Sequence, residues 1–349
     1  MKILQAMAGA PHGGAEAFFD RLVSALARAN IEQRVLTRDH PERLERLRAA
    51  GLDPVALRFG GLFDRRTRRT FAEQIRAFAP DVVLTWMSRA TAFCPRAADV
   101  GLPGGMRFVH VARLGGYYDP KYFRACDHLI ANTADIRDWL VGQNFAPERV
   151  HHLPNFVAAV PQLAVSRASL DTPEDAPLVL GLGRLHANKA WDVLLDAVAC
   201  LPAAYLWIAG EGPEQAALAR KATTLGIGAR VRWLGWRNDV PALLAAADAL
   251  VCASRHEPLG NVVIEAWAHT VPVVAAASQG PRGLIRDGVD GLLVPVDDPA
   301  ALAAALERVF GERALAGILA RAGRARYEAA FTESAVVRQY LEFFNRVAS

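Results

Sequence analysis

Short apolar runs alternate with helical patterns along the whole chain. In the first half, five runs rich in Val, Ile and Leu predict strands, and helical segments such as 16–30 and 134–144 follow some of them. The predicted strands are residues 2–7, 32–37, 81–86, 106–111 and 127–133. Because most of these runs are continuously apolar, they are typical of strands buried on both faces of a parallel sheet.

The same alternation starts afresh after a Pro-containing stretch at 151–162 and a polar stretch at 169–177. Six further strands are predicted, at residues 178–183, 204–210, 231–235, 249–254, 271–276 and 291–296. A chain of 349 residues exceeds the usual size of one domain, so we expect an α/β protein with two Rossmann-like, doubly wound domains. The predicted domains are 1–165 and 166–325, and residues 326–349 are predicted to form a C-terminal helix.

Composition narrows the class of protein. With 52% hydrophobic and 22% charged residues, the chain has the composition of an ordinary globular protein. We expect neither export nor a spanning helix, because no basic, apolar leader precedes the first strand and no apolar run approaches roughly 20 residues. The four cysteines are far apart in apolar surroundings, which we interpret as buried thiols of a cytoplasmic protein. They are Cys94, Cys126, Cys200 and Cys252.

Charge adds one local feature. The net charge of +4 gives no nucleic-acid footprint, but arginines gather on a predicted helix within residues 62–78. Such a helix can lie on an anionic membrane, which would make the protein peripheral on the inner membrane, or can present an ordinary solvated basic face. The basic residues are Arg65, Arg66, Arg68 and Arg69, and the apolar side consists of Leu62, Phe63, Phe71, Ile75 and Phe78.

Two loops between a strand and a helix carry groups suited to phosphate. Gly13 and Gly14 precede a helix with Glu16 in its first turn, so the backbone can approach an anion there, although a structural tight turn explains the pattern equally well. Arg184 and Lys189 follow the first strand of the second half. They are suited to a diphosphate, with surface ion pairs as the alternative.

The segment 254–268, SRHEPLGNVVIEAWA, is the most informative in the chain. A turn leads into a helix that begins near Asn261, where we expect unpaired amides of Gly260, Asn261 and Val262 to suit phosphate oxygens. Glu265 lies one turn into this helix and Glu257 lies in the loop before it, so their carboxylates can reach hydroxyl groups on either side of the phosphates. The segment therefore fits a whole nucleotide-sugar.

These motifs resemble those of GT-B glycosyltransferases, especially the large retaining family 4 of the bacterial glycosyl group 1 type. The resemblance covers nearly the whole chain and rests on GGAE, GRLHANK, AGEGP, LGWRNDVPALLAAADALVCAS, EPLGNVVIE and GLLVPVDDPAALAAAL. It implies two domains facing a central cleft, with the acceptor on the N-terminal domain and the donor on the C-terminal one. Residues 326–349 would cross back to the N-terminal domain.

The resemblance also implies roles for single residues. Arg184 and Lys189 would bind the donor diphosphate, Glu265 the ribose hydroxyls, and Glu257 the transferred sugar. His110, at the end of the predicted strand 106–111, would lie near that sugar, although Val111 follows it here in place of the usual acidic residue. The catalytic candidates are thus His110, Arg184, Lys189 and Glu257. Further donor contacts would come from Gly14, Gly260, Asn261, Val262, Trp236, Arg237 and Asn238.

The implied reaction is transfer of a hexose from a UDP- or GDP-sugar to a hydroxyl group of a saccharide or glycolipid, with retention of configuration. We expect no metal and no other cofactor, because two cations can neutralise the diphosphate. The product would belong to lipopolysaccharide, glycolipid or other cell-envelope polysaccharide. Two alternatives stay open: a sugar-nucleotide epimerase of the same architecture, and a non-catalytic nucleotide-sugar binding protein.

Overall fold

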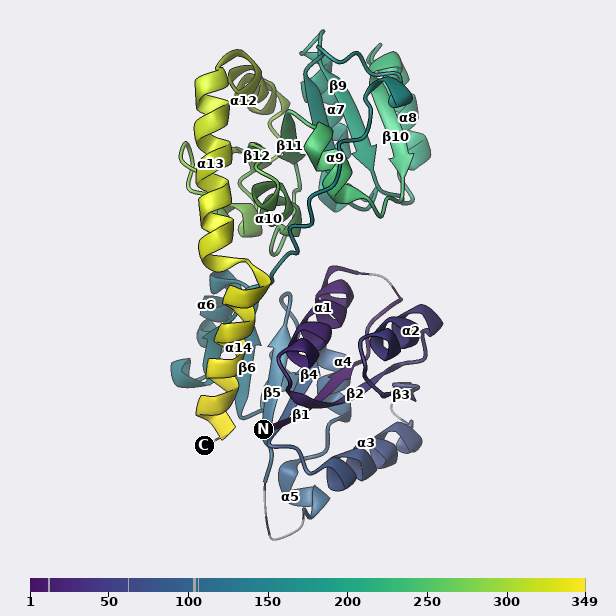
Figure 1. Ribbon diagram of the computed structural model, residues 1–349, viewed down its shortest axis with the longest axis vertical. Helices are drawn as coiled ribbons and strands as arrows, with labels where there is room; N and C mark the ends of the chain where they lie inside the picture. Colours follow the sequence, from purple (N-terminus) through teal and green to yellow (C-terminus); the bar gives the residue numbers. More distant parts are fainter. Residues whose placement is uncertain (12, 62, 103–104, 106, 349) are drawn as a thin grey trace. The chain divides into compact units, whose positions relative to one another are not determined.

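The chain folds into two compact units, each built around its own sheet. The computed structural model describes residues 1–348 except positions 12, 62, 103–104 and 106. Unit 1 comprises Met1–Asn155 and Glu333–Ser349, and unit 2 comprises Phe156–Thr332 (Figure 1). Unit 1 is therefore assembled from two segments that are separated in the sequence by the whole of unit 2.

The sheet of unit 1 is parallel throughout and has the order β3-β2-β1-β4-β5-β6-β7. Its strands are β1 (Lys2–Met7), β2 (Glu32–Arg38), β3 (Pro54–Leu57), β4 (Val82–Trp86), β5 (Val109–Leu114), β6 (His128–Ala131) and β7 (Val150–His152). The strand order reverses between β1 and β4, which is where doubly wound sheets open a crevice beyond their carboxyl ends.

The sheet of unit 2 repeats this design with the order β10-β9-β8-β11-β12-β13. Its strands are β8 (Leu178–Leu182), β9 (Tyr205–Ala209), β10 (Val231–Gly235), β11 (Ala249–Cys252), β12 (Val273–Ala276) and β13 (Leu292–Val294). All residues of β8, β11 and β12 are buried, as expected for strands covered on both faces. The prediction of two Rossmann-like parallel sheets is confirmed.

Helices cover both sheets (Figure 1). In unit 1 the α-helices are α1 (Gly14–Arg28), α2 (Pro41–Ala49), α3 (Arg65–Phe78), α4 (Met87–Phe93), α5 (Ala97–Val100), α6 (Ala134–Gly142) and α14 (Glu333–Ala348). In unit 2 they are α7 (Trp191–Ala199), α8 (Gln215–Thr224), α9 (Val240–Ala246), α10 (Asn261–Ala268), α11 (Gln279–Leu284), α12 (Pro299–Gly311) and α13 (Arg313–Ala330). Short 3-10 turns include η2 (Pro120–Phe123) and η5 (Ala187–Lys189).

The apolar side of α3 packs into the core of unit 1. Phe71 and Ile75 are fully buried and Phe78 is nearly so. These apolar residues therefore belong to the core of unit 1, because the sheet covers them. Phe63 alone of the predicted apolar side is strongly exposed among the described residues, and Leu62 lies outside them.

The strand β5 differs from its prediction. It extends from Val109 to Leu114, so His110 is its second residue and does not end it. The predicted strand 106–111 therefore begins three residues too early and ends three residues too early. In the structure Arg113 is buried between the rings of Phe18 and Trp86, at 4.5 and 4.6 Å from their centroids, and these cation–π contacts compensate its charge.

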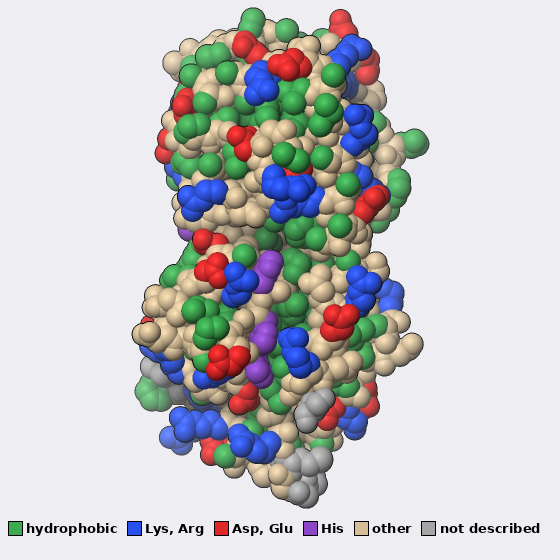
Figure 2. Space-filling view, turned by 90° about the vertical axis from the view of Figure 1, so that its left-hand side faces the viewer, with side chains coloured by type: hydrophobic (Ala, Val, Ile, Leu, Met, Phe, Trp, Pro, Cys, Tyr) green, Lys and Arg blue, Asp and Glu red, His purple; other side chains and the backbone are tan. Residues whose placement is uncertain are grey.

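Helix α14 completes unit 1. The hydroxyl of its Tyr340 accepts a hydrogen bond of 2.8 Å from Arg113, which also donates to Asn155. Phe343 packs on the rings of His128 and His151, from the neighbouring strands β6 and β7. Figure 2 shows histidine side chains gathered on this face of unit 1. The C-terminal apolar stripe is therefore a packing surface.

The burial of the four cysteines differs from one to the next. Cys126 and Cys252 are buried, but Cys94 is half-buried and Cys200 is exposed. The interpretation of four buried thiols is wrong for Cys200, since it caps the end of α7 where the helix leaves the core.

Within the described part of the chain, no helix combines the length and apolar character that crossing a bilayer requires.

We predict that Tyr340→Phe destabilises the protein more than Tyr327→Phe does. Both tyrosines are buried, but Tyr327 donates to the neutral carbonyl of Val157, whereas Tyr340 accepts from a charged guanidinium. The expected losses are about 0.5–1.5 kcal/mol for Tyr327→Phe and about 1.5–3 kcal/mol for Tyr340→Phe. Urea unfolding followed by circular dichroism measures both. Equal losses would contradict the role given to Arg113.

Candidate functional site

The strongest candidate site lies in unit 2, at the carboxyl ends of β8 and β11. The loop after β8 carries Arg184 and ends in η5 with Lys189, and the loop after β11 carries Glu257. The Lys189 Nζ forms an ion pair with Glu257 Oε2. Two residues 68 positions apart in sequence thus meet because β8 and β11 are neighbours in the sheet.

The environment of this pair keeps the lysine charged. Both side chains are largely buried, with exposed fractions of 27% for Lys189 and 13% for Glu257. Burial by itself lowers the pKa of Lys189, but the Glu257 carboxylate more than offsets this and raises it above its ordinary value. The adjacent Cys252 thiol stays protonated, because burial raises its pKa to about 11. The Lys189 ammonium group therefore lies beside the Glu257 carboxylate.

Glu257 also shapes the start of α10. Its Oε1 accepts a hydrogen bond of 3.2 Å from the amide of Gly260, and its Oε2 lies 3.5 Å from the Ser254 hydroxyl. The expectation of an unpaired Gly260 amide is therefore wrong, since a carboxylate three residues earlier satisfies it. Asn261 and Val262 open α10 as predicted, and Glu265 lies in its second turn, half-buried.

Arg184 is exposed, and no ion pair of its side chain occurs among the residues that the structure describes. The loop that carries it is fixed through its backbone: the Arg184 carbonyl accepts from Trp191 Nε1 at 2.9 Å. Gly210 packs directly on this loop, since a Cβ there would lie 1.9 Å from the Gly183 carbonyl oxygen. The close approach therefore requires a glycine at position 210, in the AGEGP segment, where it contacts the first residue of the GRLHANK segment.

The residues expected near the base form a separate group after β10. Trp236 is 62% exposed, and its Nε1 donates to the Asn238 side chain at 3.2 Å. Arg237 is held by an ion pair of 2.6 Å with Asp239. The Trp236 amide donates to Glu211, a carboxylate that sequence analysis missed. Its position directly after β9 was the available signal, because residues that follow buried parallel strands lie at the ligand-binding edge.

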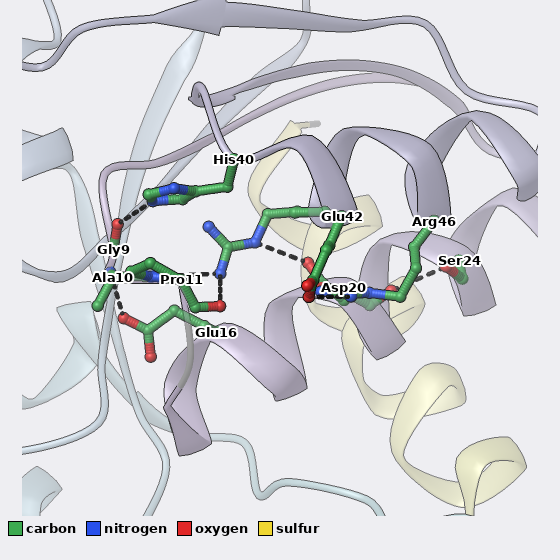
Figure 3. Close-up of polar contacts among 10 residues, drawn as sticks. Gly9, Ala10, Pro11, Glu16, Asp20, Ser24, His40, Glu42 and Arg46 are labelled. Atoms are coloured by element: carbon green, nitrogen blue, oxygen red, sulfur yellow. Dashed lines mark hydrogen bonds and ion pairs between the residues drawn. The ribbon is translucent and has the colours of Figure 1, made fainter. Parts of the chain in front are cut away.

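In unit 1 the loop between β1 and α1 is held from two sides (Figure 3). On one side, the Glu16 carboxylate accepts from the Ala10 amide at 2.9 Å and fills the space beside Gly13. A Cβ on Gly13 would lie 2.2 Å from Glu16 Oε2, so a larger residue there would displace the Glu16 carboxylate from its present position. Gly14 is exposed and is the first residue of α1.

On the other side, Arg43 of α2 reaches under the same loop. Its side chain is 1% exposed and donates to the carbonyl of Ala10 at 2.8 Å and to that of Pro11 at 3.2 Å. Asp20 of α1 lies 3.2 Å from its Nε (Figure 3). Sequence analysis missed Arg43, because PERLERLRA has the charge pattern of an ordinary surface helix.

His110 lies away from the carboxyl edge of its sheet. It pairs with Val83, three residues before the end of β4, and it is buried beside Thr85, whose hydroxyl lies 3.0 Å from its Nε2. Burial lowers the pKa of His110 to about 4, so the imidazole is neutral at pH 7. The structure brings Lys189 and Glu257 together but sets His110 back inside the sheet of unit 1.

No group of three or more His, Cys, Asp or Glu side chains suited to hold a metal ion occurs among the described residues. Groups in unit 2 that can contact an anionic ligand include the cations of Arg184 and Lys189 and the start of α10. Such groups bind phosphate oxygens well, while Glu257 and Glu265 can accept hydrogen bonds from hydroxyls.

Comparison with known proteins identifies the family of this chain. Residues 12–159 match the family model described as Glycosyltransferase Family 4, and residues 176–312 match the model described as Glycosyl transferases group 1. The chain is 37% identical to the lipopolysaccharide core biosynthesis glycosyltransferase LpsE of Rhizobium meliloti, over 95% of each chain. It is 34% identical to LpsD of the same organism, over 99% of this chain and 98% of LpsD.

A solved structure shows the same fold. Anabaena Alr3699/HepE, in complex with UDP and glucose, has a TM-score of 0.84 and 22% identity, and the match covers 99% of this chain and 100% of that one. The chain thus belongs to the family 4 glycosyltransferases of the group 1 type. Its two Rossmann-like units are those of the GT-B fold.

We predict that Glu257→Gln lowers the pKa of Lys189 relative to the unmodified protein. Removing the carboxylate leaves the cost of burial, which disfavours the charged amine. The Cε chemical shift of ¹³C-labelled lysine against pH reports this pKa, and the exposed Lys121 serves as an internal reference. An unchanged titration midpoint for Lys189 would show that Glu257 is not its main counter-charge.

Proposed function

We propose that this glycosyltransferase moves a hexose from a nucleotide-diphosphate sugar to a saccharide of the lipopolysaccharide core, with retention of configuration. The observation that carries the proposal is the Lys189–Glu257 pair at the carboxyl ends of β8 and β11, beside the start of α10. The two Rhizobium meliloti relatives, which act in lipopolysaccharide core biosynthesis by name, support this choice of acceptor.

The proposed chemistry follows from where charge develops. As the bond to the sugar breaks, negative charge grows on the leaving diphosphate, and preformed cations then stabilise the transition state more than the ground state. Arg184 and Lys189 supply these cations in the proposal, so that no metal ion is needed. Glu257 holds hydroxyls of the transferred sugar and Glu265 holds the ribose.

Retention is proposed to occur by attack on the same face that the diphosphate leaves. The leaving phosphate oxygen accepts the proton of the acceptor hydroxyl as the new glycosidic bond forms. No carboxylate then has to act as a nucleophile. A glycosyl adduct trapped on the protein would contradict this part of the proposal.

The donor is proposed to be a UDP- or GDP-sugar, and Gly14, Val262 and the group Trp236–Arg237–Asn238 are proposed to contact it. The complex of HepE with UDP and glucose supports testing UDP-glucose first. A thermal-shift screen with UDP-, GDP- and ADP-sugars identifies the donor, since a ligand that binds only the folded state raises its melting temperature. Product analysis then separates transfer from epimerisation, which needs no acceptor.

We predict that Arg184→Ala lowers kcat/KM for transfer by about 100-fold, because one charged contact to the developing anion is lost. The fold should be intact, since the Arg184 side chain is exposed. The matched control is Arg220→Ala, which removes an exposed arginine from α8 and should leave kcat/KM unchanged. A kcat/KM like that of the control would remove Arg184 from the diphosphate site.

Peripheral binding to the inner membrane is proposed to be electrostatic, since the apolar side of α3 is buried. Arg65, Arg66, Arg68 and Arg69 are exposed on this helix. At about 1 kcal/mol per basic residue near an anionic surface, they give reversible binding that salt weakens. Sedimentation with anionic vesicles should therefore fall with salt and in the variant with all four arginines changed to Gln. If the unchanged protein ignores such vesicles at low salt, the membrane proposal fails.

A further inference from the structure

A pocket of about 300 Å³ opens beside α3 and α4 in unit 1. Its walls come from three successive segments that follow the carboxyl ends of β3, β4 and β5. These segments contribute Gly60 and Gly61 after β3, Ser88 and Arg89 after β4, and Tyr122 after β5, and α3 contributes Arg68. The pocket therefore lies toward the edge of this sheet where doubly wound folds bind their ligands.

Two guanidinium groups line this pocket, and none of its described lining residues is acidic. Arg68 donates to the carbonyl of Ala92 at 3.1 Å, and Arg89 donates to the carbonyl of Phe59 at 3.3 Å. Neither forms an ion pair with any residue that the structure describes. The carboxylate of Asp64, in the loop before α3, accepts hydrogen bonds from Gly60 and Thr67 instead. The pocket thus carries positive charge without a counter-ion from the lining residues.

The arginines are also held in place. Arg68 stacks on the ring of Phe93 with its guanidinium carbon 5.0 Å from the ring centroid. A guanidinium fixed by a ring and a carbonyl loses little further freedom when it binds an oxyanion, and its remaining N–H groups match carboxylate and phosphate oxygens. The hydroxyls of Ser88 and Tyr122 add neutral hydrogen-bonding groups of the kind that recognise sugar hydroxyls.

We propose that this pocket binds an anionic substituent, a phosphate or carboxylate group, carried by the saccharide acceptor. The inference rests on the proposed function and specifies the chemistry of its acceptor. Two other cavities of unit 1 fit less well. The one with Arg58 and Arg66 includes the carboxylate of Asp39, and the one at His110 includes Asp127, which precedes β6 and so lies at the opposite edge of the sheet.

The test compares charged and neutral sugars by isothermal titration calorimetry. Methyl mannoside 6-phosphate and methyl galactosiduronate carry the two candidate anions, and methyl mannoside and methyl galactoside are their neutral counterparts. We expect at least one charged sugar to bind about tenfold or more tightly than its counterpart, and the pair that shows this identifies the anion. Arg68→Gln and Arg89→Gln should each remove this preference. Arg48→Gln, which changes an exposed arginine of α2 outside the pocket, should retain it.

The variants are first checked for donor-induced thermal shifts, which separate two kinds of failure. If no nucleotide-sugar shifts even the unchanged protein, the proposed function fails. If the donor shift is normal but charged and neutral sugars bind alike, the anion subsite is overturned. It is equally overturned if both pocket variants keep the preference, or if inorganic phosphate binds as tightly as the sugar phosphate. Since Arg68 also packs on Phe93, a loss of folding in Arg68→Gln leaves Arg89→Gln to decide.

Discussion

The requirement that neighbouring strands run parallel governs both halves of this protein. A parallel strand can be followed by its neighbour only after a crossover, so every strand ends at the same edge of its sheet and every loop after it emerges there. This is why Lys189 and Glu257, far apart in sequence, share one ion pair, and why Arg89 and Tyr122 line one pocket. The parallel arrangement alone thus brings residues from different loops together at each site.

Buried charge fixes the loops at these edges. Arg43 holds two carbonyls of the loop after β1, and Glu257 holds the first turn of α10. Each group would be costly to bury alone, so each constrains its partners to one arrangement. A backbone held in this way is already ordered before a phosphate arrives, which lowers the cost of binding it.

Sequence patterns predicted the two sheets and the helix at Asn261, because continuous apolar runs and glycine turns are local signals. They failed where a contact with a residue distant in the sequence determines the structure, because a local pattern does not contain that contact. The predicted strand 106–111 stops short of Arg113, an arginine that the strand can include because two rings and Tyr340 surround it. The Gly260 amide was expected to be unpaired, but the Glu257 carboxylate folds back and accepts its hydrogen bond. The apolar side of α3 is covered by the sheet, which a local sequence pattern cannot show. His110 was misplaced with the strand that contains it.

The assembly of unit 1 from two separated segments has a consequence for synthesis on the ribosome. Unit 2 is one continuous stretch and is complete before α14 is made. Until then, Arg113 lacks its hydroxyl partner Tyr340, and the histidines of β6 and β7 lack their cover Phe343. Residues 1–155 are therefore made before unit 2 but reach their native state only after α14 has been made. In the nascent chain, the guanidinium of Arg113 and the surface that α14 later covers are therefore exposed to solvent. Chaperones bind intermediates with such exposed surfaces.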